Sequence, residues 1–384
     1  MQTIYLDHNA TTPVDPDVLQ AMLPFLREEF GNPSTTYTLG RRAHLAVENA
    51  RAEVAALIGA SPDEIIFTSG GTEASNLAIR GAAMLDERRR TIVTSMIEHP
   101  ATQACCELLE RERHRVRRVP PRPDGRVDPQ RVAEAIDGDT ALVTVIHAQN
   151  EIGTLQPIGE IADAARAHGA LVHADAAQSI GKVPVDVNDL GVDLLSIAGH
   201  KLYAPKGVGA LYVQRGVKLP PLLVGAGQES GRRPGTENVA GIVALGEACR
   251  IAGLLLEQGA SGRIAGLAAE LLAQLRSEVP RLALVGHATE RLPNTLNVLF
   301  PGVSGRRLLE GCPRVQASTG SACHADREEP SVILAALGIP PEQALGAVRL
   351  SIGRTTTADD VEAAASSLAA AWRLTARAAA ADVA

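Results

Sequence analysis

The chain has 384 residues, of which 45% are hydrophobic and 21% charged, and its formal net charge is −7. This composition is typical of a globular protein and excludes an intrinsically disordered one, while the length exceeds what one hydrophobic core usually supports, so we expect two lobes. The acidic balance and the 2% aromatic content argue against nucleic acid or a membrane surface as a partner.

Short β-branched runs alternate with helix-length segments up to residue 213. Such alternation requires crossover connections and indicates a mostly parallel sheet that is covered on both faces. The last two runs are separated by a Gly/Pro segment too short for a helix, which predicts one antiparallel edge. The six predicted strands lie at residues 64–68, 91–95, 141–147, 170–174, 192–197 and 208–213.

The pattern changes after Gly241. A helical region rich in Ala and Leu runs over residues 242–279, and three predicted strands at 294–300, 314–318 and 347–352 precede a closing helix over about 358–380. This order predicts a smaller α+β lobe. We therefore expect a large domain over residues 14–250 and a small domain formed by residues 1–13 and 251–384.

Targeting signals and disulfides are not expected. The first residues lack the basic and apolar parts of a secretory signal, and the longest apolar stretches fall far short of the roughly 20 residues that a membrane span needs. The five cysteines are an odd number without C-x-x-C spacing, which disfavours both a disulfide framework and a structural zinc site. The pattern favours a cytoplasmic protein without a metal centre.

A glycine-rich turn follows the predicted strand at residues 64–68, in the segment Thr68-Ser-Gly-Gly-Thr-Glu-Ala-Ser-Asn76. Gly70 and Gly71 let backbone N–H groups approach an anion, Thr72 adds a hydroxyl, and the helix N-terminus adds a positive dipole. The turn therefore suits a phosphate, although a plain turn with a helix cap has the same sequence features. It lacks the patterns of a P-loop or a dinucleotide site.

Two polar residues follow other predicted strands. Asp175 lies at the strand end where open α/β sheets bind ligands, and it could cap a helix or keep a ring nitrogen protonated. Lys201, beside His200, could extend to solvent, but a desolvated lysine can form a Schiff base. A phosphate-binding turn, an acid and a lysine at strand ends are together what pyridoxal phosphate requires.

These residues resemble the cysteine desulfurase family, in the class V aminotransferase group of fold-type I pyridoxal-phosphate enzymes. The resemblance spans nearly the whole chain and implies an α/β fold and a homodimer. The motifs that carry it are Asp7-x-x-Ala-Thr-Thr-Pro13, Gly70-Gly-Thr-Glu73, Glu98-His99, Asn150-Glu151, Asp175-x-x-Gln178, Gly199-His-Lys201, Arg233-x-Gly-Thr236 and Arg349-Leu-Ser-Ile-Gly-Arg354.

The resemblance implies a role for each matching residue. Lys201 would bind the aldehyde of pyridoxal 5'-phosphate, Asp175 would hold its ring nitrogen and Gln178 its phenolic oxygen. His99 would stack on the ring and move protons. With Asn150, Arg349 would fix the substrate carboxylate, which suits a guanidinium. The other cofactor contacts that it implies are Gly71, Thr72, Asn150, His200 and, from the partner subunit, Thr236.

Cys323 lies among small residues and before a charged stretch, in residues 317–330. This composition favours a mobile loop, whereas a buried inert cysteine is the common alternative. The segment resembles the persulfide loop of cysteine desulfurases, so the Cys323 thiolate would attack the sulfur of cofactor-bound L-cysteine. The products would be L-alanine and a Cys323 persulfide, which a sulfur acceptor or scaffold protein receives, as in iron–sulfur cluster assembly.

Some positions resemble a related enzyme instead. Ala198 replaces a phosphate-binding serine of many desulfurases and Tyr37 replaces a histidine, and both resemble animal selenocysteine lyases, whereas Pro100 matches nitrogen-fixation-type desulfurases. The alternatives are therefore a selenocysteine lyase acting on L-selenocysteine, a transaminase of the same fold with Cys323 incidental, and a non-catalytic binding protein.

The remaining candidates take simpler interpretations. Three cysteines and one histidine are expected to be packed in the core: Cys105, Cys106, Cys249 and His173. Cys312 could relay sulfur because it lies near Cys323 in the sequence. The basic run at residues 111–118 is expected to be a solvated face, and it could also contact an acidic partner.

Overall fold

The computed structural model describes residues 3–319 and 329–381, and its largest element is a seven-stranded sheet. The strand order is β2-β8-β7-β6-β5-β3-β4, and the strands from β7 to β4 are parallel. β8 is antiparallel to both neighbours, so the antiparallel strand lies inside the sheet and β2 forms the edge. The bounds are β2 (Ile65–Thr68), β3 (Thr91–Ser95), β4 (Arg115–Val119), β5 (Thr140–Ile146), β6 (Leu171–Asp175), β7 (Leu194–Ala198) and β8 (Gly209–Val213).

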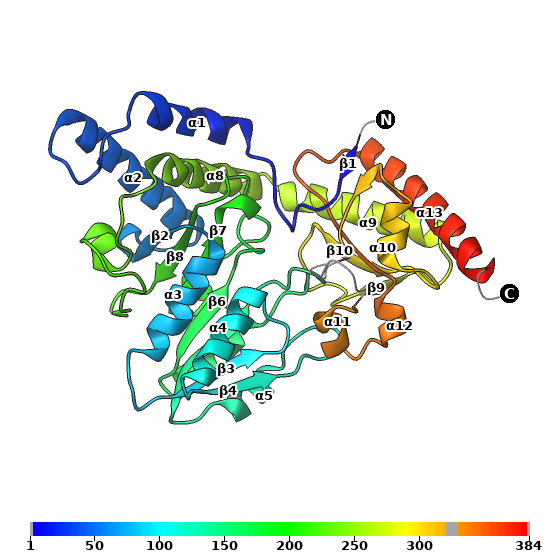
Figure 1. The fold of residues 1–384 in the computed structure, drawn as a ribbon, viewed down its shortest axis with the longest axis horizontal. Coiled ribbons are helices and arrows are strands. Elements are labelled where there is room, and N and C mark those ends of the chain that lie inside the picture. Colours follow the sequence, from blue (N-terminus) through cyan, green and yellow to red (C-terminus); the bar gives the residue numbers. More distant parts are fainter. Residues whose placement is uncertain (1–2, 320–328, 382–384) are drawn as a thin grey trace.

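Alternate residues of these strands face two apolar layers, as a sheet covered on both faces requires. α3 and α4 cover one face, where Leu142 and Leu194 are buried, and α2, α6 and α8 cover the other, where Val143 and Leu195 are buried. Figure 1 shows α3 and α4 packed along the sheet. The helices are α1 (Pro16–Arg27), α2 (Thr38–Leu57), α3 (Gly71–Ala83), α4 (Pro100–Arg111), α5 (Pro129–Ala135), α6 (Ile158–Arg166), α7 (Val187–Leu190) and α8 (Val239–Glu257).

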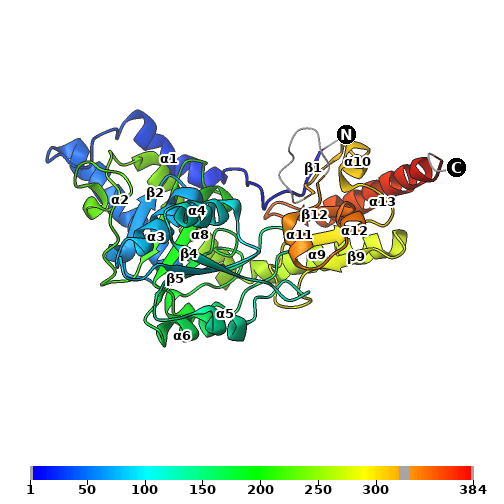
Figure 2. The ribbon, with the colours of Figure 1, turned by 60° about the horizontal axis from the view of Figure 1, so that its bottom comes forward.

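A second lobe is built on the antiparallel sheet β12-β10-β9. Its own apolar cluster includes Leu271 of α9, Leu308 of α10 and Leu368 of α13. β1 pairs with β11, which brings the start of the chain into this lobe beside α13 (Figures 1 and 2). The bounds are β1 (Ile4–Tyr5), α9 (Ala260–Glu278), β9 (Ala283–Val285), β10 (Thr295–Leu299), α10 (Gly305–Glu310), β11 (Val315–Gln316), α11 (Val332–Ala336), α12 (Pro341–Ala344), β12 (Ala347–Ser351) and α13 (Ala358–Ala381).

The chain passes between the lobes more than once. After β1 it crosses to α1 on the larger lobe, and it returns after α8, which runs through residue 250. α11, although late in the chain, joins the apolar cluster of the larger lobe through Ile333 and Leu334. The domain division at residues 13 and 250 stays a prediction.

The basic run at residues 111–118 has no buried residue, as expected of a solvated face, and it also contains most of β4. β4 pairs in parallel with β3 at the edge of the sheet, and its arginines 115, 117 and 118 form ion pairs with Asp139, Asp137 and Glu110. Charged side chains are tolerated on an edge strand, where they discourage pairing with another chain. This segment therefore pairs with β3 through its backbone while its charged side chains remain at the surface.

Helix α8 corrects the expectation about apolar stretches. Among the described residues it is long and apolar enough to cross a membrane, with a mean hydropathy of 1.8 over Val239–Glu257. Half of that stretch is buried within the protein, and the helix packs against α1 and α2. Its composition is therefore that of a core helix, and such a helix alone is weak evidence for a membrane span.

Candidate active site

The predicted phosphate turn lies between β2 and α3. Gly70 has φ +150° and ψ −179°, a backbone conformation that is strained for any residue with a side chain. Gly209 packs against it, because a Cβ at Gly209 would lie 2.7 Å from the Gly70 Cα. Gly71 begins α3 with Ala198 of β7 against it, because a Cβ at Gly71 would be 3.2 Å from the Ala198 Cβ. The exposed Thr72 follows in the first helical turn. Glycine backbone, a helix N-terminus and a hydroxyl therefore meet at one place, which fits a phosphate group.

Lys201 ends the short 3-10 turn Gly199–Lys201 that follows β7. Its Nζ donates to the Asn9 carbonyl oxygen at 2.7 Å. Burial, aided by the charge of Arg349, lowers the pKa of Lys201 to about 8, although the carboxylates of Asp175 and Asp7 oppose this. An amine that loses its proton so near neutrality can attack an aldehyde.

Asp175 is the last residue of β6 and is 5% exposed. One carboxylate oxygen accepts the Ala177 N–H at 3.0 Å, so the capping role considered from the sequence is present in part. Its charge acts on both Lys201 and His99, which places all three groups in one site. A buried carboxylate at this strand end fits a protonated ring nitrogen.

The two site histidines differ in their surroundings. His99 caps α4 and its Nδ1 accepts the Ala101 N–H at 3.1 Å, which leaves the ring proton on Nε2. Burial lowers its pKa. Burial and the nearby Lys201 and Lys206 lower the pKa of His200 to about 4. Both rings are therefore neutral near pH 7 and can donate or accept a single proton.

Gln178 is buried, and its Nε2 donates to the same Asn9 carbonyl oxygen at 2.9 Å. Lys201 and Gln178 come from separate segments, and they meet at this acceptor. The structure thus brings together the lysine and the amide that the resemblance places on the cofactor aldehyde and on its phenolic oxygen.

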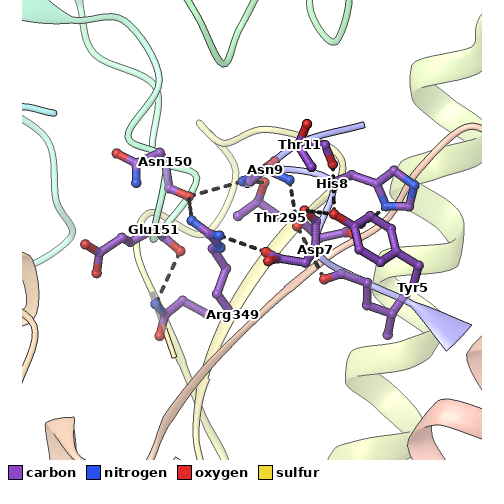
Figure 3. A network of polar contacts seen from close by, with 12 residues as sticks. Tyr5, Asp7, His8, Asn9, Thr11, Asn150, Glu151, Thr295 and Arg349 are labelled. Atoms are coloured by element: carbon purple, nitrogen blue, oxygen red, sulfur yellow. Dashed lines mark hydrogen bonds and ion pairs between the residues drawn. The ribbon is translucent and has the colours of Figure 1, made fainter. Parts of the chain in front are cut away.

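Arg349 lies on β12 between Asp7 and Asn150, as Figure 3 shows. Its Nη2 donates to Asp7 Oδ1 at 2.8 Å and its Nη1 donates to the Asn150 carbonyl oxygen at 3.1 Å. Its Nε is buried and finds no hydrogen-bond partner among the described residues. Because buried polar groups are nearly always paired, this free N–H indicates room for an acceptor such as a carboxylate.

Two predicted site residues are not brought to this centre by the described chain. Thr236 is exposed, on a loop whose Arg233 pairs with Glu73 of α3 at 2.9 Å. Cys323 lies outside the described residues. On either side of residues 320–328 the chain is attached to the site. The backbone carbonyl oxygen of Ser318 accepts the backbone N–H of Arg349 at 2.6 Å. The Ser331 hydroxyl donates to the Glu151 carboxylate at 2.6 Å.

The other cysteines and His173 have structural positions. Cys105, Cys106 and Cys249 are buried, as predicted, and burial raises their pKa. His173 is fully buried and hydrogen-bonded to the Thr144 and Ser196 hydroxyls at 2.8 Å each. Cys312 is 4% exposed, in the apolar cluster of the second lobe.

Sequence reasoning assigned no role to three residues of this site. Asp7 pairs with Arg349, Asn9 accepts from Lys201, and Lys182 donates to Gln178 at 2.6 Å. Asp7 lies within a motif of the resemblance, and Lys182 lies four positions after Gln178, the spacing of one helical turn. Nothing in the sequence signals Asn9.

The fold and this set of groups define a pyridoxal-phosphate enzyme of the aminotransferase type, and the Aminotransferase class-V family matches residues 4–364. The chain belongs to that family, among its cysteine desulfurases. It is 43% identical over 364 residues to "Cysteine desulfurase IscS" of Dictyoglomus turgidum, over 93% of this chain and 91% of the relative.

Solved structures agree with the predicted fold class. A "NifS-like protein" has a TM-score of 0.89 at 36% identity, covering 96% of this chain and 99% of its own. A structure described as "SspA in complex with cysteine" has a TM-score of 0.81 at 35% identity, covering 92% and 100%. The expectation of an α/β, fold-type I architecture is confirmed.

Proposed function

We propose that the chain is a pyridoxal-phosphate-dependent cysteine desulfurase that converts L-cysteine to L-alanine and holds the sulfur as a persulfide on Cys323. One observation carries the proposal: an amine with a pKa of about 8, Lys201, lies within electrostatic range of Arg349, whose buried Nε has no hydrogen-bond partner in residues 3–319 and 329–381. An aldehyde-binding amine beside a carboxylate-binding guanidinium suits an amino-acid substrate. The cysteine desulfurase relatives support L-cysteine as that substrate.

The residues present fit the cofactor. The N-terminus of α3 with Gly71, Thr72 and His200 would hold the phosphate, Asp175 the ring nitrogen and Gln178 the phenolic oxygen. Bound pyridoxal phosphate supplies an aldehyde and a ring that withdraws electrons from an attached amino acid. Because Ala198 has no hydroxyl, the backbone N–H groups at Gly71 carry more of the phosphate binding.

The other residues would act on the substrate. Arg349 and Asn150 hold its carboxylate, and His99, whose proton is on Nε2, moves protons at its reacting carbons. The Cys323 thiolate attacks the substrate sulfur, so that an S–S bond forms as the C–S bond breaks. The electron pair of that bond passes to the substrate carbon, which is then protonated to give alanine.

The role of Cys323 is tested by Cys323→Ser, with Cys312→Ser as the matched control. Cys323→Ser should still bind the cofactor and L-cysteine, but it should release no sulfide and carry no persulfide when assayed by mass spectrometry. Cys312→Ser should retain both products. Full desulfurase turnover by Cys323→Ser would contradict the nucleophile and favour a transaminase or a selenocysteine lyase.

We also propose a cytoplasmic homodimer in which Thr236 reaches the phosphate of the partner subunit. The exposed position of Thr236 and of its loop supports a contact between subunits. Sedimentation of the purified enzyme, together with cofactor affinity of Thr236→Ala, tests both statements. A monomer with undiminished activity would contradict them.

A further inference from the structure

Asn9 is fully buried and uses every polar atom that it has. Its N–H donates to the Ser351 hydroxyl at 3.0 Å, and its carbonyl oxygen accepts from Lys201 and Gln178. Its Nδ2 donates to the Asn150 carbonyl at 3.2 Å and to the Thr295 hydroxyl at 2.8 Å, two contacts that Figure 3 shows. The residue that presents an acceptor to Lys201 is therefore held from both lobes.

Lys182 completes this network from the side of the larger lobe. Its Nζ donates to Asn9 Oδ1 at 3.0 Å and to Gln178 Oε1 at 2.6 Å. Asn294 Nδ2 also donates to Asn9 Oδ1, at 3.1 Å. The Lys182 amine thus holds the side chains of Asn9 and Gln178, and these two residues meet at the acceptor of the Lys201 amine.

The Lys182 amine and the Asn9 carbonyl oxygen together decide which way the Gln178 amide points. An amide oxygen and nitrogen are nearly interchangeable in shape, so only their partners fix the orientation. The two N–H groups directed at Asn9 and Gln178 make Lys182 a donor to both, so Gln178 must turn its oxygen toward Lys182. Its Nε2 then faces the Asn9 carbonyl, next to Lys201.

A purely structural reason for a lysine here is weak. An amine in this position loses hydration, and burial together with the charges of Lys201 and Arg349 lowers its pKa well below the usual value. An apolar side chain of similar length would avoid that cost but would leave the buried Gln178 Oε1 without its donor, so the amide that Lys182 holds accounts for a lysine here. The Lys182 Nζ carries at least two N–H groups whether or not it is protonated, and these match the two side-chain acceptors that it contacts.

We propose that Lys182 is a positioning residue, which holds Gln178 with its amide N–H directed at the Asn9 carbonyl oxygen beside Lys201, where the phenolic oxygen of the cofactor would be bound. This inference rests on the proposed function. Without Lys182 the Gln178 amide keeps only its contact with the Asn9 carbonyl oxygen, so its N–H groups are held less firmly on that side. The proton equilibrium of the bound cofactor therefore depends on a residue that does not touch it.

The test compares Lys182→Met with wild type and with Lys218→Met, an exposed lysine as matched control. Loss of one oriented hydrogen bond should weaken pyridoxal-phosphate binding about three- to tenfold. It should also shift the midpoint of the pH titration of visible absorbance. Lys182→Arg, which keeps the donors, should restore the wild-type midpoint, and Lys218→Met should change neither value.

A double variant separates positioning from a general loss of structure. If Lys182 acts through Gln178, Lys182→Met should add no further change to Gln178→Leu in either readout. Additive effects, or a Lys182→Met enzyme with wild-type affinity and titration, would overturn the proposal. Should Lys182→Met not fold, Lys182→Leu, alone and combined with Gln178→Leu, gives the same comparison, and the double variant is expected to match Gln178→Leu.

The cofactor-free protein gives an independent readout. Solvent exchange of the Gln178 side-chain amide hydrogens, followed by NMR, should be faster in Lys182→Met than in wild type. Unchanged exchange would overturn the positioning role by itself. Failure of wild type to bind pyridoxal phosphate would contradict the proposed function, while the exchange measurement would still decide the role of Lys182.

Discussion

At the scale of single residues, burial changes what Lys201 can do. Its Nζ has only the Asn9 carbonyl as a hydrogen-bond partner among the described residues, and the Arg349 charge disfavours a second cation nearby. We expect the rate of cofactor attachment to the cofactor-free enzyme to rise with pH, with a midpoint near 8 instead of the ordinary 10.5. The sign follows because the neutral amine attacks and the protonated amine does not. Spectral change after adding pyridoxal phosphate, recorded across pH, measures this rate.

Lys201→Ala is the control for that titration, and Lys206→Ala is the matched surface variant. Borohydride should trap no cofactor on Lys201→Ala and a full equivalent on Lys206→Ala. Trapping at another lysine in Lys201→Ala, or a midpoint above 10 in wild type, would show that the assignment is wrong.

Arg349 gives a second prediction at this scale. Its guanidinium is held by Asp7 and by the Asn150 carbonyl, while Nε contacts no acceptor in the part of the chain that the structure describes. Arg349→Lys removes the planar set of donors, so KM for L-cysteine should rise about ten- to hundredfold with a smaller change in kcat. Arg306→Lys, on the surface, should leave both constants unchanged. Steady-state alanine release decides this, and an unchanged KM in Arg349→Lys would remove the carboxylate role.

At the scale of elements, the sequence predicted those strands and helices whose residues carry a clear local pattern. All six strand runs of the large sheet are present, because strands that are buried on both faces read as continuous apolar runs. β4 was missed, since its arginines carry the signal of a surface while its backbone pairs with β3. The single helical region predicted after Gly241 is two helices, because Gly259, with φ +75°, ends one and opens the next.

The loop that carries Thr236 depends on a buried ion pair. Arg51 of α2 donates twice to Glu229 at 2.8 Å, and Glu229 also accepts the Phe67 N–H of β2 at 2.8 Å. The Glu229 side chain is 4% exposed, so Arg51→Met would leave a buried carboxylate unpaired. We expect the free energy of unfolding to fall by about 3–5 kcal/mol, as measured by urea denaturation.

The control for Arg51→Met is Arg88→Met. Arg88 pairs with Asp86 but its side chain is 90% exposed, and surface pairs contribute at most about 1 kcal/mol. Similar losses in both variants would mean that the Arg51–Glu229 pair does not hold the loop.

At the scale of the whole molecule, the site is made by segments that the sequence keeps far apart. The motifs around Asp175 and Lys201 could be recognised because each follows a strand of one sheet, where ligands of α/β proteins bind. Asn9 and Lys182 could not, since their contacts exist only once the N-terminal segment lies between the lobes. Residues that do chemistry carry local signatures, whereas residues that orient them are defined by tertiary contacts.

The choice between L-cysteine and L-selenocysteine also belongs to the whole enzyme. A selenol has a lower pKa than a thiol and the carbon–selenium bond is weaker, so removing selenium requires less help from an enzyme thiolate. Removing sulfur requires the Cys323 thiolate within about 3–3.5 Å of the substrate sulfur. Pro100, which begins α4 directly after His99, adds no carboxylate there, and a carboxylate would disfavour a nearby thiolate.

We therefore expect wild type to turn over both amino acids, with L-selenocysteine faster, and Cys323→Ser to keep only L-selenocysteine turnover. Alanine release from each substrate, with a reductant present to clear the persulfide, measures both activities in one assay. Cys312→Ser should behave as wild type, because its thiol is buried in the second lobe. Selenocysteine turnover without any cysteine turnover in wild type would make the chain a selenocysteine lyase, since the Cys323 thiolate would then not be reaching the substrate sulfur.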